Sequence, residues 1–368
     1  MENRPELIEK LCADKSLLPV LRKVEASERL SFEDGVRLLE TDDLHTVGMM
    51  ADMVKRRKSG DKVYFVVNRH INPSNICAIS CKFCAFGKTK KSPDAYEMTT
   101  EQILGLLHSD LKEVHIVGGL HPDWEFSHYL NIVRAIREAQ PSCHIKAFTA
   151  VEIDWFSEIS GKPVERVLED LTAAGVNALT GGGAEILHPE IRKKICAPKT
   201  VATKWEEIHK LAHGMGIPTN ATILYGHLEK PFHVIDHFER LRNLEDESPG
   251  FFAFIPVLFQ PANTGLKDIP PFPASYDMKI HAAARLFLDN IPHIKAYWIT
   301  LGEKAAQVAL HYGASDADGT IMREKIIHDA GAPSELGHSR DFMVNMIKNA
   351  GYVPVERDAL YNELRVYN

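Results

Sequence analysis

The stretch Asn75-Ile-Cys77-Ala-Ile-Ser-Cys81-Lys-Phe-Cys84-Ala-Phe86 carries three cysteines at spacings of four and then three residues. A loop with this spacing can wrap three corners of a cubic iron–sulfur cluster, because cysteine thiolates are the usual ligands of such clusters. No fourth cysteine lies nearby, so one iron would lack a protein ligand and could take a small molecule, as catalytic metal sites do. The sequence therefore predicts one 4Fe–4S cluster on Cys77, Cys81 and Cys84.

Two other uses of these cysteines stay open. Three thiols can belong to a zinc site, with His70 as a fourth ligand, although His70 precedes the loop on an expected strand. They can also be buried free thiols, because unpaired cysteine behaves as a small hydrophobic residue. A disulfide framework is not expected, since an odd local number leaves one thiol over. The remaining cysteines, Cys12, Cys143 and Cys196, are scattered and are expected to be structural.

Length and composition restrict the class of protein. The chain has 368 residues, a size at which barrel folds occur as single domains. Its 45% hydrophobic and 25% charged residues are typical of a globular protein. A net charge of −7 argues against nucleic-acid binding, and no apolar run approaches the length of a membrane span. The first ten residues are too charged for a signal peptide, so we expect a cytoplasmic location, where thiols stay reduced.

The chain is expected to have three parts. Residues 1–60 carry a helical pattern, with a capping box at Ser31 and Asp34. The last of these helices should end at Gly60 after the basic run Lys55–Lys58, which we interpret as a solvated helix end. We expect an N-terminal helical cap over 1–60, a barrel over 61–330, and a C-terminal helix and tail over 331–368 that pack on the barrel.

Beyond Gly60, short apolar runs alternate with amphipathic segments of helical length. The expected strands are 63–68, 113–118, 145–150, 178–181, 220–225, 251–258, 296–300 and a weak 319–322. The expected helices are 100–112, 127–139, 164–174, 204–215, 233–247, 276–290, 304–312 and 339–349. Alternating βα units imply a parallel sheet with helices outside it. Eight units predict an α/β fold, a closed (β/α)8 barrel of the TIM type, although the weak eighth strand leaves fewer strands possible.

The motifs that can carry chemistry follow the expected strands. In such barrels the active site lies at the C-terminal ends of the strands. Gly118 and Gly119 follow the second strand, where glycine lets the backbone approach a ligand, and His121 is either a ligand partner or an ordinary loop histidine. Glu152 follows the third strand, and Gly181–Glu185 follows the fourth. The two glutamates can accept hydrogen bonds from a ligand, or can stabilise helix N-termini.

The fifth strand has an unusual polar face. Asn220 and Thr222 point the same way, whereas parallel strands are normally apolar on both faces. Polar groups that face a barrel lumen need partners, and a bound substrate can supply them; a buried pair without a ligand is the alternative. Arg192 likewise has two interpretations, a bidentate partner for a carboxylate or a surface cation on a short helix.

Longer phrases carry a family resemblance. They are Asn68-Arg-His-Ile-Asn-Pro-Ser-Asn75, Val114-His-Ile-Val-Gly-Gly-Leu-His-Pro122, His144-Ile-Lys-Ala-Phe-Thr-Ala-Val-Glu-Ile153, Gly181-Gly-Gly-Ala-Glu-Ile186 and Thr219-Asn-Ala-Thr-Ile-Leu-Tyr-Gly-His227. With the cysteine motif, they resemble radical S-adenosylmethionine (SAM) enzymes of the aminofutalosine synthase family. Dehypoxanthine futalosine cyclases and FO synthase-type enzymes share the barrel and the cysteines, and stay as alternatives. A non-catalytic iron–sulfur or zinc-binding protein is an alternative of another class.

The resemblance implies a definite reaction. SAM is a co-substrate, and its 5′-deoxyadenosyl radical adds to the vinyl carbon of 3-(1-carboxyvinyloxy)benzoate. Rearrangement and decarboxylation then give 6-amino-6-deoxyfutalosine, an intermediate of menaquinone biosynthesis. The implied electron donor is a reductase, a flavodoxin or a ferredoxin. The sequence departs from the family pattern at Leu120-His121, where many radical SAM enzymes carry Glu after the two glycines.

The resemblance also implies two sets of site residues. Those expected to bind the cluster-bound SAM are Phe83, Gly118, Gly119, His121, Glu152 and Glu185. The substrate has two carboxylates, which need cations or polar donors. The residues expected to bind it are Arg69, His70, Asn75, Asn220, Thr222 and His227.

Overall fold

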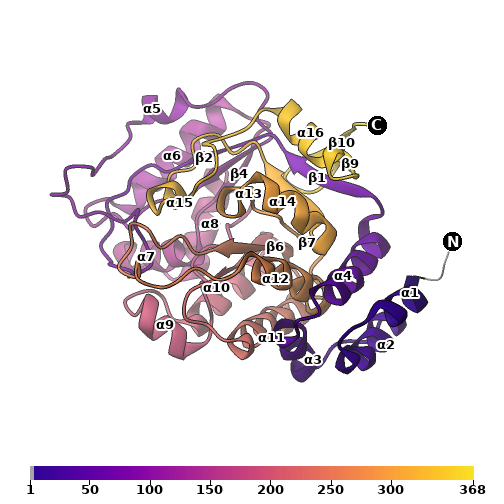
Figure 1. Ribbon diagram of the computed structural model, residues 1–368. Helices are drawn as coiled ribbons and strands as arrows, with labels where there is room; N and C mark the ends of the chain where they lie inside the picture. Colours follow the sequence, from indigo (N-terminus) through magenta and orange to yellow (C-terminus); the bar gives the residue numbers. More distant parts are fainter. Residues whose placement is uncertain (1–3) are drawn as a thin grey trace.

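The computed structural model describes residues 4–368 and contains an inner ring of parallel strands. The strands of this ring are β1 (Lys62–Val66), β2 (Asn68–Ile71), β3 (Glu113–Ile116), β4 (His144–Ala147), β5 (Thr219–Tyr225), β6 (Phe251–Leu258), β7 (His293–Ile294) and β8 (Asp316–Gly319). Their apolar side chains form the core. The strands lie at the centre of the molecule, with most helices around them (Figure 1).

Parallel ladders close this ring. One joins β2, β3 and β4, a second joins β5, β6 and β7, and a third joins β8 to β1. The remaining gaps are closed by isolated bridges: Lys146 with Ala178, Leu179 with Thr219, and Lys295 with Asp316. Because β1 and β2 are two halves of one stretch that breaks at Val67, eight positions surround the lumen. The predicted (β/α)8 barrel is confirmed, with the fourth position reduced to a two-residue bridge.

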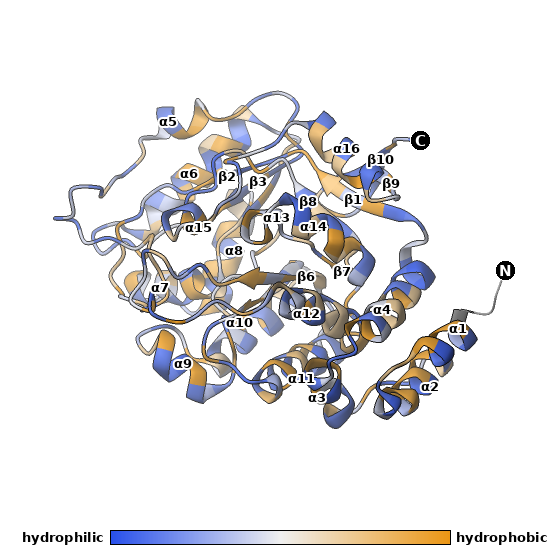
Figure 2. Ribbon diagram, in the orientation of Figure 1, coloured by the Kyte–Doolittle hydropathy of each residue, from blue (hydrophilic) through white to orange (hydrophobic). Residues whose placement is uncertain are grey.

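The outer helices present their apolar sides to this ring. They include α5 (Thr100–Leu104), α6 (Phe126–Ala139), α7 (Ala150–Ser160), α8 (Val164–Ala174), α9 (Pro189–Ile195), α10 (Ala202–Gly214), α11 (Pro231–Glu247), α12 (Ala274–Phe287) and α14 (Glu303–Ala309). In α8, Val164, Val167, Leu168 and Leu171 are all buried, which is the spacing of one helix face. Figure 2 shows the same division, with many helices orange on one side and blue on the other.

The last two strands were predicted in the wrong places. The expected seventh strand, 296–300, is mostly the short helix α13 (Trp298–Leu301), and β7 precedes it. The aromatic residues that suggested a strand instead cover the barrel, where Trp298 Nε1 donates to Gly319 O at 2.9 Å. The expected eighth strand, 319–322, lies three residues too late, because Ile321 and Met322 have φ angles of 61° and 43° and cannot extend a strand.

The N-terminal helices are α1 (Arg4–Leu11), α2 (Leu18–Ala26), α3 (Phe32–Glu40) and α4 (Leu44–Ser59). The expected part began at residue 1, and residues 1–3 lie outside the described residues. The predicted capping box is present, with Ser31 N donating to Asp34 Oδ2 at 2.9 Å, and Gly60 ends α4 as predicted. Lys55 corrects one expectation: it is buried rather than solvated, and its Nζ donates to Gly60 O at 3.0 Å.

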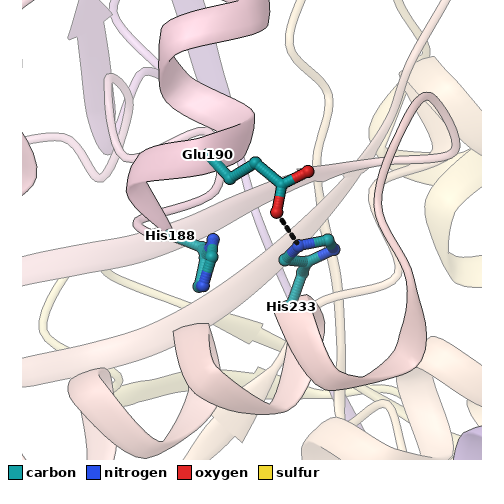
Figure 3. A group of neighbouring side chains, drawn as sticks. All are labelled: His188, Glu190 and His233. Atoms are coloured by element: carbon teal, nitrogen blue, oxygen red, sulfur yellow. Dashed lines mark ion pairs between the residues drawn. The ribbon is translucent and has the colours of Figure 1, made fainter.

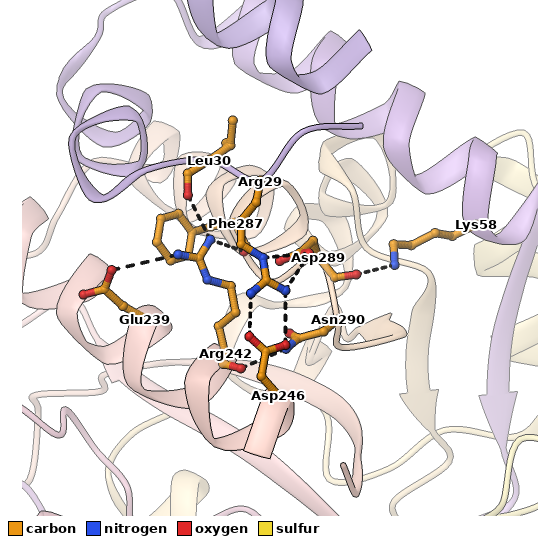
Figure 4. A network of polar contacts seen from close by, with 9 residues as sticks. All are labelled: Arg29, Leu30, Lys58, Glu239, Arg242, Asp246, Phe287, Asp289 and Asn290. Carbon is orange, nitrogen blue, oxygen red and sulfur yellow. Dashed lines mark hydrogen bonds and ion pairs between the residues drawn. The ribbon is translucent and has the colours of Figure 1, made fainter. Parts of the chain in front are cut away.

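Two arginines join these N-terminal helices to the barrel (Figure 4). Arg242 on α11 is buried, and its Nη1 donates to Leu30 O at 2.9 Å and to Phe287 O at 3.3 Å. Its guanidinium lies 3.9 Å from the centre of the Phe287 ring. Arg29 is more exposed and forms ion pairs with Asp246 and Asp289. The contact therefore combines one buried and one exposed arginine.

The C-terminal segment adds two strands that the sequence pattern did not reveal. After α16 (Arg340–Asn349), β9 (Val353–Arg357) pairs in parallel with β1, and β10 (Glu363–Val366) pairs antiparallel with β9. β9 lies between β1 and β10, and Pro354 is just outside the three residues of β9 that pair with β10. There only its carbonyl is used, accepting from Tyr367 N at 3.0 Å, so the missing N–H of proline is tolerated. Arg357 closes the lumen below, pairing with Asp316 at 2.7 Å with both side chains buried.

Candidate active site

A cavity of about 330 Å³ opens at the C-terminal ends of the strands. The cysteine loop forms one wall, and the turns at Gly118–Gly119 and Gly181–Gly183 form another. Lys146 and Lys295 line its inner end, inside the barrel. This is the position in which (β/α)8 barrels carry their active sites, so the predicted location is supported by the geometry.

Backbone hydrogen bonds hold the cysteine loop between two other parts of the barrel. Cys77 N donates to Lys88 O at 2.9 Å, which closes the loop on itself. Ala78 N donates to Leu120 O at 2.7 Å, next to the glycine turn after β3. Lys82 N donates to Ile195 O at 2.9 Å, at the end of α9. The cysteines are therefore on a loop whose course is set by contacts on both sides.

The three cysteines line the same cavity. All are free and half-buried, and a Cβ placed on Gly87 would lie 3.8 Å from Cys84 Sγ and 4.0 Å from Cys77 Sγ. Backbone N–H groups already point at two sulfurs, from Leu120 to Cys77 and from Gly87 to Cys84, each at 3.4 Å. Burial raises the pKa of Cys81 to about 12, so its thiolate needs a positive partner. The irons of a cluster supply that charge, and the site fits the predicted group.

A group of side chains that could suggest a metal ion lies elsewhere (Figure 3). Within residues 4–368, only His188, Glu190 and His233 bring three His, Cys, Asp or Glu ligand atoms within 4.8 Å of one another. His233 Nδ1 accepts the N–H of Lys230 at 2.9 Å, so neutral His233 carries its proton on Nε2, which faces Glu190 at 3.5 Å. A metal would have to displace that proton. We therefore assign His233 to capping α11.

The glycine turn after β3 packs directly on the cysteine loop. A side chain at Gly119 would collide with the carbonyl of Ile76, which explains the glycine there. Gly118 N donates to Glu152 Oε1 at 3.0 Å, and Thr149 N donates to Glu152 Oε2 at 2.7 Å. Glu152 is thus a helix-capping carboxylate on α7 that also lines the cavity, and its hydrogen bond to a ligand stays a prediction.

The triple-glycine turn forms the next part of this wall. Gly183 has a φ of 91°, which favours glycine. Arg192 is buried and donates to the carbonyl oxygens of Gly183, Ala184 and Thr200, so it braces this turn and is neither a surface cation nor a ligand partner. Glu185 lines the cavity and accepts from Lys199 Nζ at 2.5 Å.

Charged and aromatic side chains surround the inner end of the cavity. Lys146 Nζ donates to Glu113 at 2.7 Å, and Lys295 Nζ donates to Asp318 at 3.2 Å. Above them, the rings of His70 and His115 stack with centroids 4.4 Å apart and an interplanar angle of 19°. The hydroxyl-bearing ring of Tyr297 also lines this end. The cavity therefore has a thiol-rich outer end and a nitrogen-rich inner end.

Several predicted site residues line this cavity. Of the residues expected to bind SAM, Phe83, Gly118, Gly119, Glu152 and Glu185 are at its walls. His121 is not: it is buried beside Trp124, and its Nε2 lies 2.9 Å from Glu97 Oε1. The structure therefore places His121 in the support of the loop rather than at the ligand.

The residues expected to bind substrate divide in the same way. His70 and Thr222 line the cavity, with Thr222 Oγ1 donating to Gly181 O at 2.8 Å. Asn75 Nδ2 instead donates to Asp94 O at 2.9 Å, holding the cysteine loop. His227 lies outside the cavity, its Nε2 2.9 Å from Leu224 O and its Nδ1 accepting from Leu228 N.

Arg69 and Asn220 also lie away from the cavity wall. Arg69 is buried on β2, the strand that carries His70, but points to the other side. Asn220 shares the face of Thr222 as predicted, but lies lower in the barrel, where it lines a small separate space with Lys146 and Arg357. The alternation of side chains along the strand predicted which face Asn220 is on, but not how deep in the barrel lumen it lies.

The sequence did not indicate several polar residues of the cavity wall, among them His115, Lys146, Lys199, Lys295 and Tyr297. A signal was available for two of them. His115 and Lys146 are polar residues in the middle of short apolar strands, the same anomaly that drew attention to Asn220. Lys295 and Tyr297 were hidden by the misplaced seventh strand.

Comparison with known proteins agrees with this site. The model of the Radical SAM superfamily matches residues 71–241, and that of the CofH/MqnC C-terminal region matches residues 248–367. Aminodeoxyfutalosine synthase of Thermus thermophilus is 43% identical, over 96% of this chain and 98% of the relative. The Streptomyces coelicolor protein of the same name is 42% identical, over 94% of this chain and 93% of the relative. Cyclic dehypoxanthine futalosine synthase of Streptomyces coelicolor is 32% identical, over 96% of this chain and 90% of the relative.

Solved structures support the fold. Methylornithine synthase aligns with a TM-score of 0.68 at 17% identity, covering 90% of this chain and 96% of that one. The FeFe-hydrogenase maturase of Carboxydothermus hydrogenoformans aligns with a TM-score of 0.72 at 16% identity, covering 97% of this chain and 84% of that one. At these identities the likeness concerns the fold alone.

Proposed function

Because this chain belongs to the radical SAM superfamily, and within it to the family that includes aminodeoxyfutalosine synthase, we propose that it adds the 5′-deoxyadenosyl group of SAM to 3-(1-carboxyvinyloxy)benzoate. Rearrangement and loss of one carboxylate then give 6-amino-6-deoxyfutalosine. The observation that carries the proposal is a single cavity with three cysteines at one end and two lysines at the other. Such a cavity suits SAM at the outer end and a substrate with two carboxylates beside it.

Each wall has a task in this proposal. Cys77, Cys81 and Cys84 would hold the 4Fe–4S cluster, which with SAM supplies an adenosyl radical when reduced. The carbonyls of the Gly118–Gly119 turn and the Glu152 carboxylate are acceptors for the SAM ammonium. Ile255 and Val257 are apolar residues of the cavity wall and help to exclude water, which protects a radical and strengthens the ionic contacts.

Relatives with other substrates define the alternatives. A 5-amino-6-(D-ribitylamino)uracil–L-tyrosine 4-hydroxyphenyl transferase of Methanopyrus kandleri is 37% identical, over 88% of this chain and 90% of the relative. Cyclic dehypoxanthine futalosine synthase is the other relative named above. The 42–43% identity to the two aminodeoxyfutalosine synthases favours adenosyl addition over these reactions.

The fate of the adenosyl carbon tests the proposal. The reconstituted enzyme is incubated anaerobically with a reductant, the enol-ether substrate and SAM labelled with ¹³C at the 5′ carbon. Addition predicts the label in one larger product, with methionine released one for one. Hydrogen abstraction predicts the label in free 5′-deoxyadenosine that carries a substrate hydrogen. The second result would overturn the proposed reaction and leave the superfamily assignment standing.

The electron donor and the location belong to the same proposal. We expect a reductase, flavodoxin or ferredoxin to deliver the electron near the cysteine loop. Lys82 on this loop and Lys193 on α9 are both exposed, and neither has an ion-pair partner among the described residues, so this surface suits an acidic carrier. The six free cysteines fit a reducing cytoplasm. None of the helices described in residues 4–368 is long and apolar enough to cross a bilayer.

A further inference from the structure

The inner end of the cavity contains hydrogen-bonding groups that the protein itself leaves unused. His70 and His115 stack on each other, yet neither imidazole has a hydrogen-bond partner among the residues described. The hydroxyl of Tyr297, which lines the same end, also lacks one. Tyr297 is buried and the two histidines are half-buried in the cavity wall. Polar groups inside a protein normally have partners, so three unused groups on one wall indicate the position of a polar ligand atom.

The two lysines beside these imidazoles are neutralised before any ligand binds. Lys146 is paired with Glu113 at 2.7 Å, and Lys295 with Asp318 at 3.2 Å. All four of these side chains are buried. Two cations and two anions give these four residues no net charge, and the buried Glu324 carboxylate, which also lines the cavity and faces His70, adds a further negative charge. An anion that enters therefore meets lysines that are already neutralised, and it needs a further positive charge.

We propose that His70 and His115, together with Lys146 and Lys295, form a subsite for a carboxylate, and that the histidine pair takes up one proton when the carboxylate binds. This inference rests on the proposed function, because it assigns one end of that substrate. The ligand class is an aromatic carboxylate. The positive charge that holds the substrate carboxylate, a protonated imidazole, is thus present only when the substrate is bound.

The chemistry of the substrate decides which carboxylate enters. The vinyl carbon must lie beside the 5′ carbon of SAM, which is at the cysteine end of the cavity. The ring carboxylate is at the opposite end of the substrate from the vinyl group. It therefore reaches His70 and His115, and pins the vinyl carbon at near-attack distance.

The proton uptake follows from the groups that face the imidazoles. Burial lowers the pKa of both His70 and His115, so both rings are neutral in the empty cavity. Glu324, Asp318 and Glu113 raise the pKa of His70, and Lys146 lowers it. For His115, the neighbouring His70, Lys146 and Lys295 lower the pKa, and Glu113 raises it. A substrate carboxylate adds a negative charge at contact distance, which raises the pKa of the nearer imidazole. One proton then enters with the substrate.

Calorimetry measures this proton directly. The cluster-loaded enzyme, without reductant so that no turnover occurs, is titrated with 3-(1-carboxyvinyloxy)benzoate in two buffers of different ionisation enthalpy. The difference in heat gives the number of protons taken up. We expect about one proton per substrate just above neutral pH, from the opposite-charge effect on the imidazole. The neutral isostere 3-(1-carboxyvinyloxy)benzamide should take up none. Equal proton numbers for the two ligands would overturn the proposal.

Variants assign the proton to the histidine pair. His115→Gln keeps a hydrogen-bonding side chain but cannot become charged, so proton uptake should fall and affinity for the carboxylate should drop about ten- to hundredfold. Affinity for the benzamide should stay within about twofold, which separates lost charge from lost folding. The matched control is His108→Gln, because His108 does not line the cavity. A His115→Gln enzyme with undiminished proton uptake and affinity would refute the subsite.

The two proposals fail in different ways. If the substrate binds with proton uptake but labelled SAM gives no adduct, the carboxylate subsite stands and the proposed reaction does not. If the adduct forms, but substrate binding takes up no proton and its affinity is unchanged in His115→Gln, the proposed reaction stands and the carboxylate subsite is wrong.

Discussion

Cys84 and Cys143 are both free thiols, but only Cys84 lies on the cavity wall. Cys143 is buried before β4, with its Sγ 3.8 Å from His144 O. Removing a cluster ligand should lower the iron bound, whereas removing a buried thiol should cost only packing. We expect Cys84→Ala to lose most of its iron and acid-labile sulfide after anaerobic reconstitution, and Cys143→Ala to keep both. A Cys84→Ala protein with full iron content and SAM cleavage would contradict the cluster assignment.

Glu152 should make the stability of the protein depend on pH. Burial raises the pKa of its carboxyl from 4.5 to about 7, against hydrogen bonds from Thr149 and Gly118 that lower it. The folded state therefore favours the protonated form, and its stabilising effect is complete below pH 4.5 and is lost as the pH rises through 7. Over this interval the free energy of unfolding should fall by about 3 kcal/mol more in the wild type than in Glu152→Gln.

Urea unfolding across that pH range, with the protein free of SAM, checks the Glu152 prediction. Glu158→Gln is the matched control, because Glu158 lies on the exposed side of the same helix, α7. If Glu152→Gln and wild type lose stability in parallel, the carboxyl titrates normally.

At the scale of elements, the N-terminal helices are attached to α11 and α12 through two arginines of different burial (Figure 4). The Arg242 guanidinium bonds two carbonyls and lies on the Phe287 ring, which a lysine cannot reproduce. Arg242→Lys should lower the free energy of unfolding by about 2–3 kcal/mol. Arg29→Lys, at an exposed pair of carboxylates, should cost less than about 1 kcal/mol. Chemical unfolding of both variants measures the difference, and equal costs would mean that apolar contacts alone dock these helices.

Across the whole molecule, the C-terminal segment closes the barrel from below. Arg357 on β9 pairs with Asp316 on β8, so two elements far apart in sequence share one buried ion pair. Arg357→Leu leaves the Asp316 carboxylate buried without this cation, and should destabilise the protein by about 3–5 kcal/mol. Arg365→Leu on the exposed strand β10 is the control and should change stability by less than about 1 kcal/mol. Thermal unfolding compares them; a mild effect of Arg357→Leu would show that Lys146 and Lys295 compensate.

Local sequence was enough for most elements of the barrel. Helices with a clear apolar face, such as α8, begin and end where the pattern predicted. The pattern failed where tertiary contacts overrode local preference. The aromatic run after β7 packs over the lumen instead of extending a strand. β9 forms despite Pro354 because it pairs with β1 along its length, and Pro354 lies outside the residues that pair with β10.

The sequence by itself determined the cysteine loop, the alternation of strands and helices, and the glycines beside the loop. These features depend on spacing along the chain, which is visible in the residues. Only the tertiary structure decided which polar side chains meet in the cavity. The predicted residues His121, His227 and Asn220 do not line the cavity, whereas His115 and the lysines at the inner end do. The physical reason is that depth in a closed barrel depends on how neighbouring strands are staggered, and the stagger is fixed by ladders between residues distant in sequence.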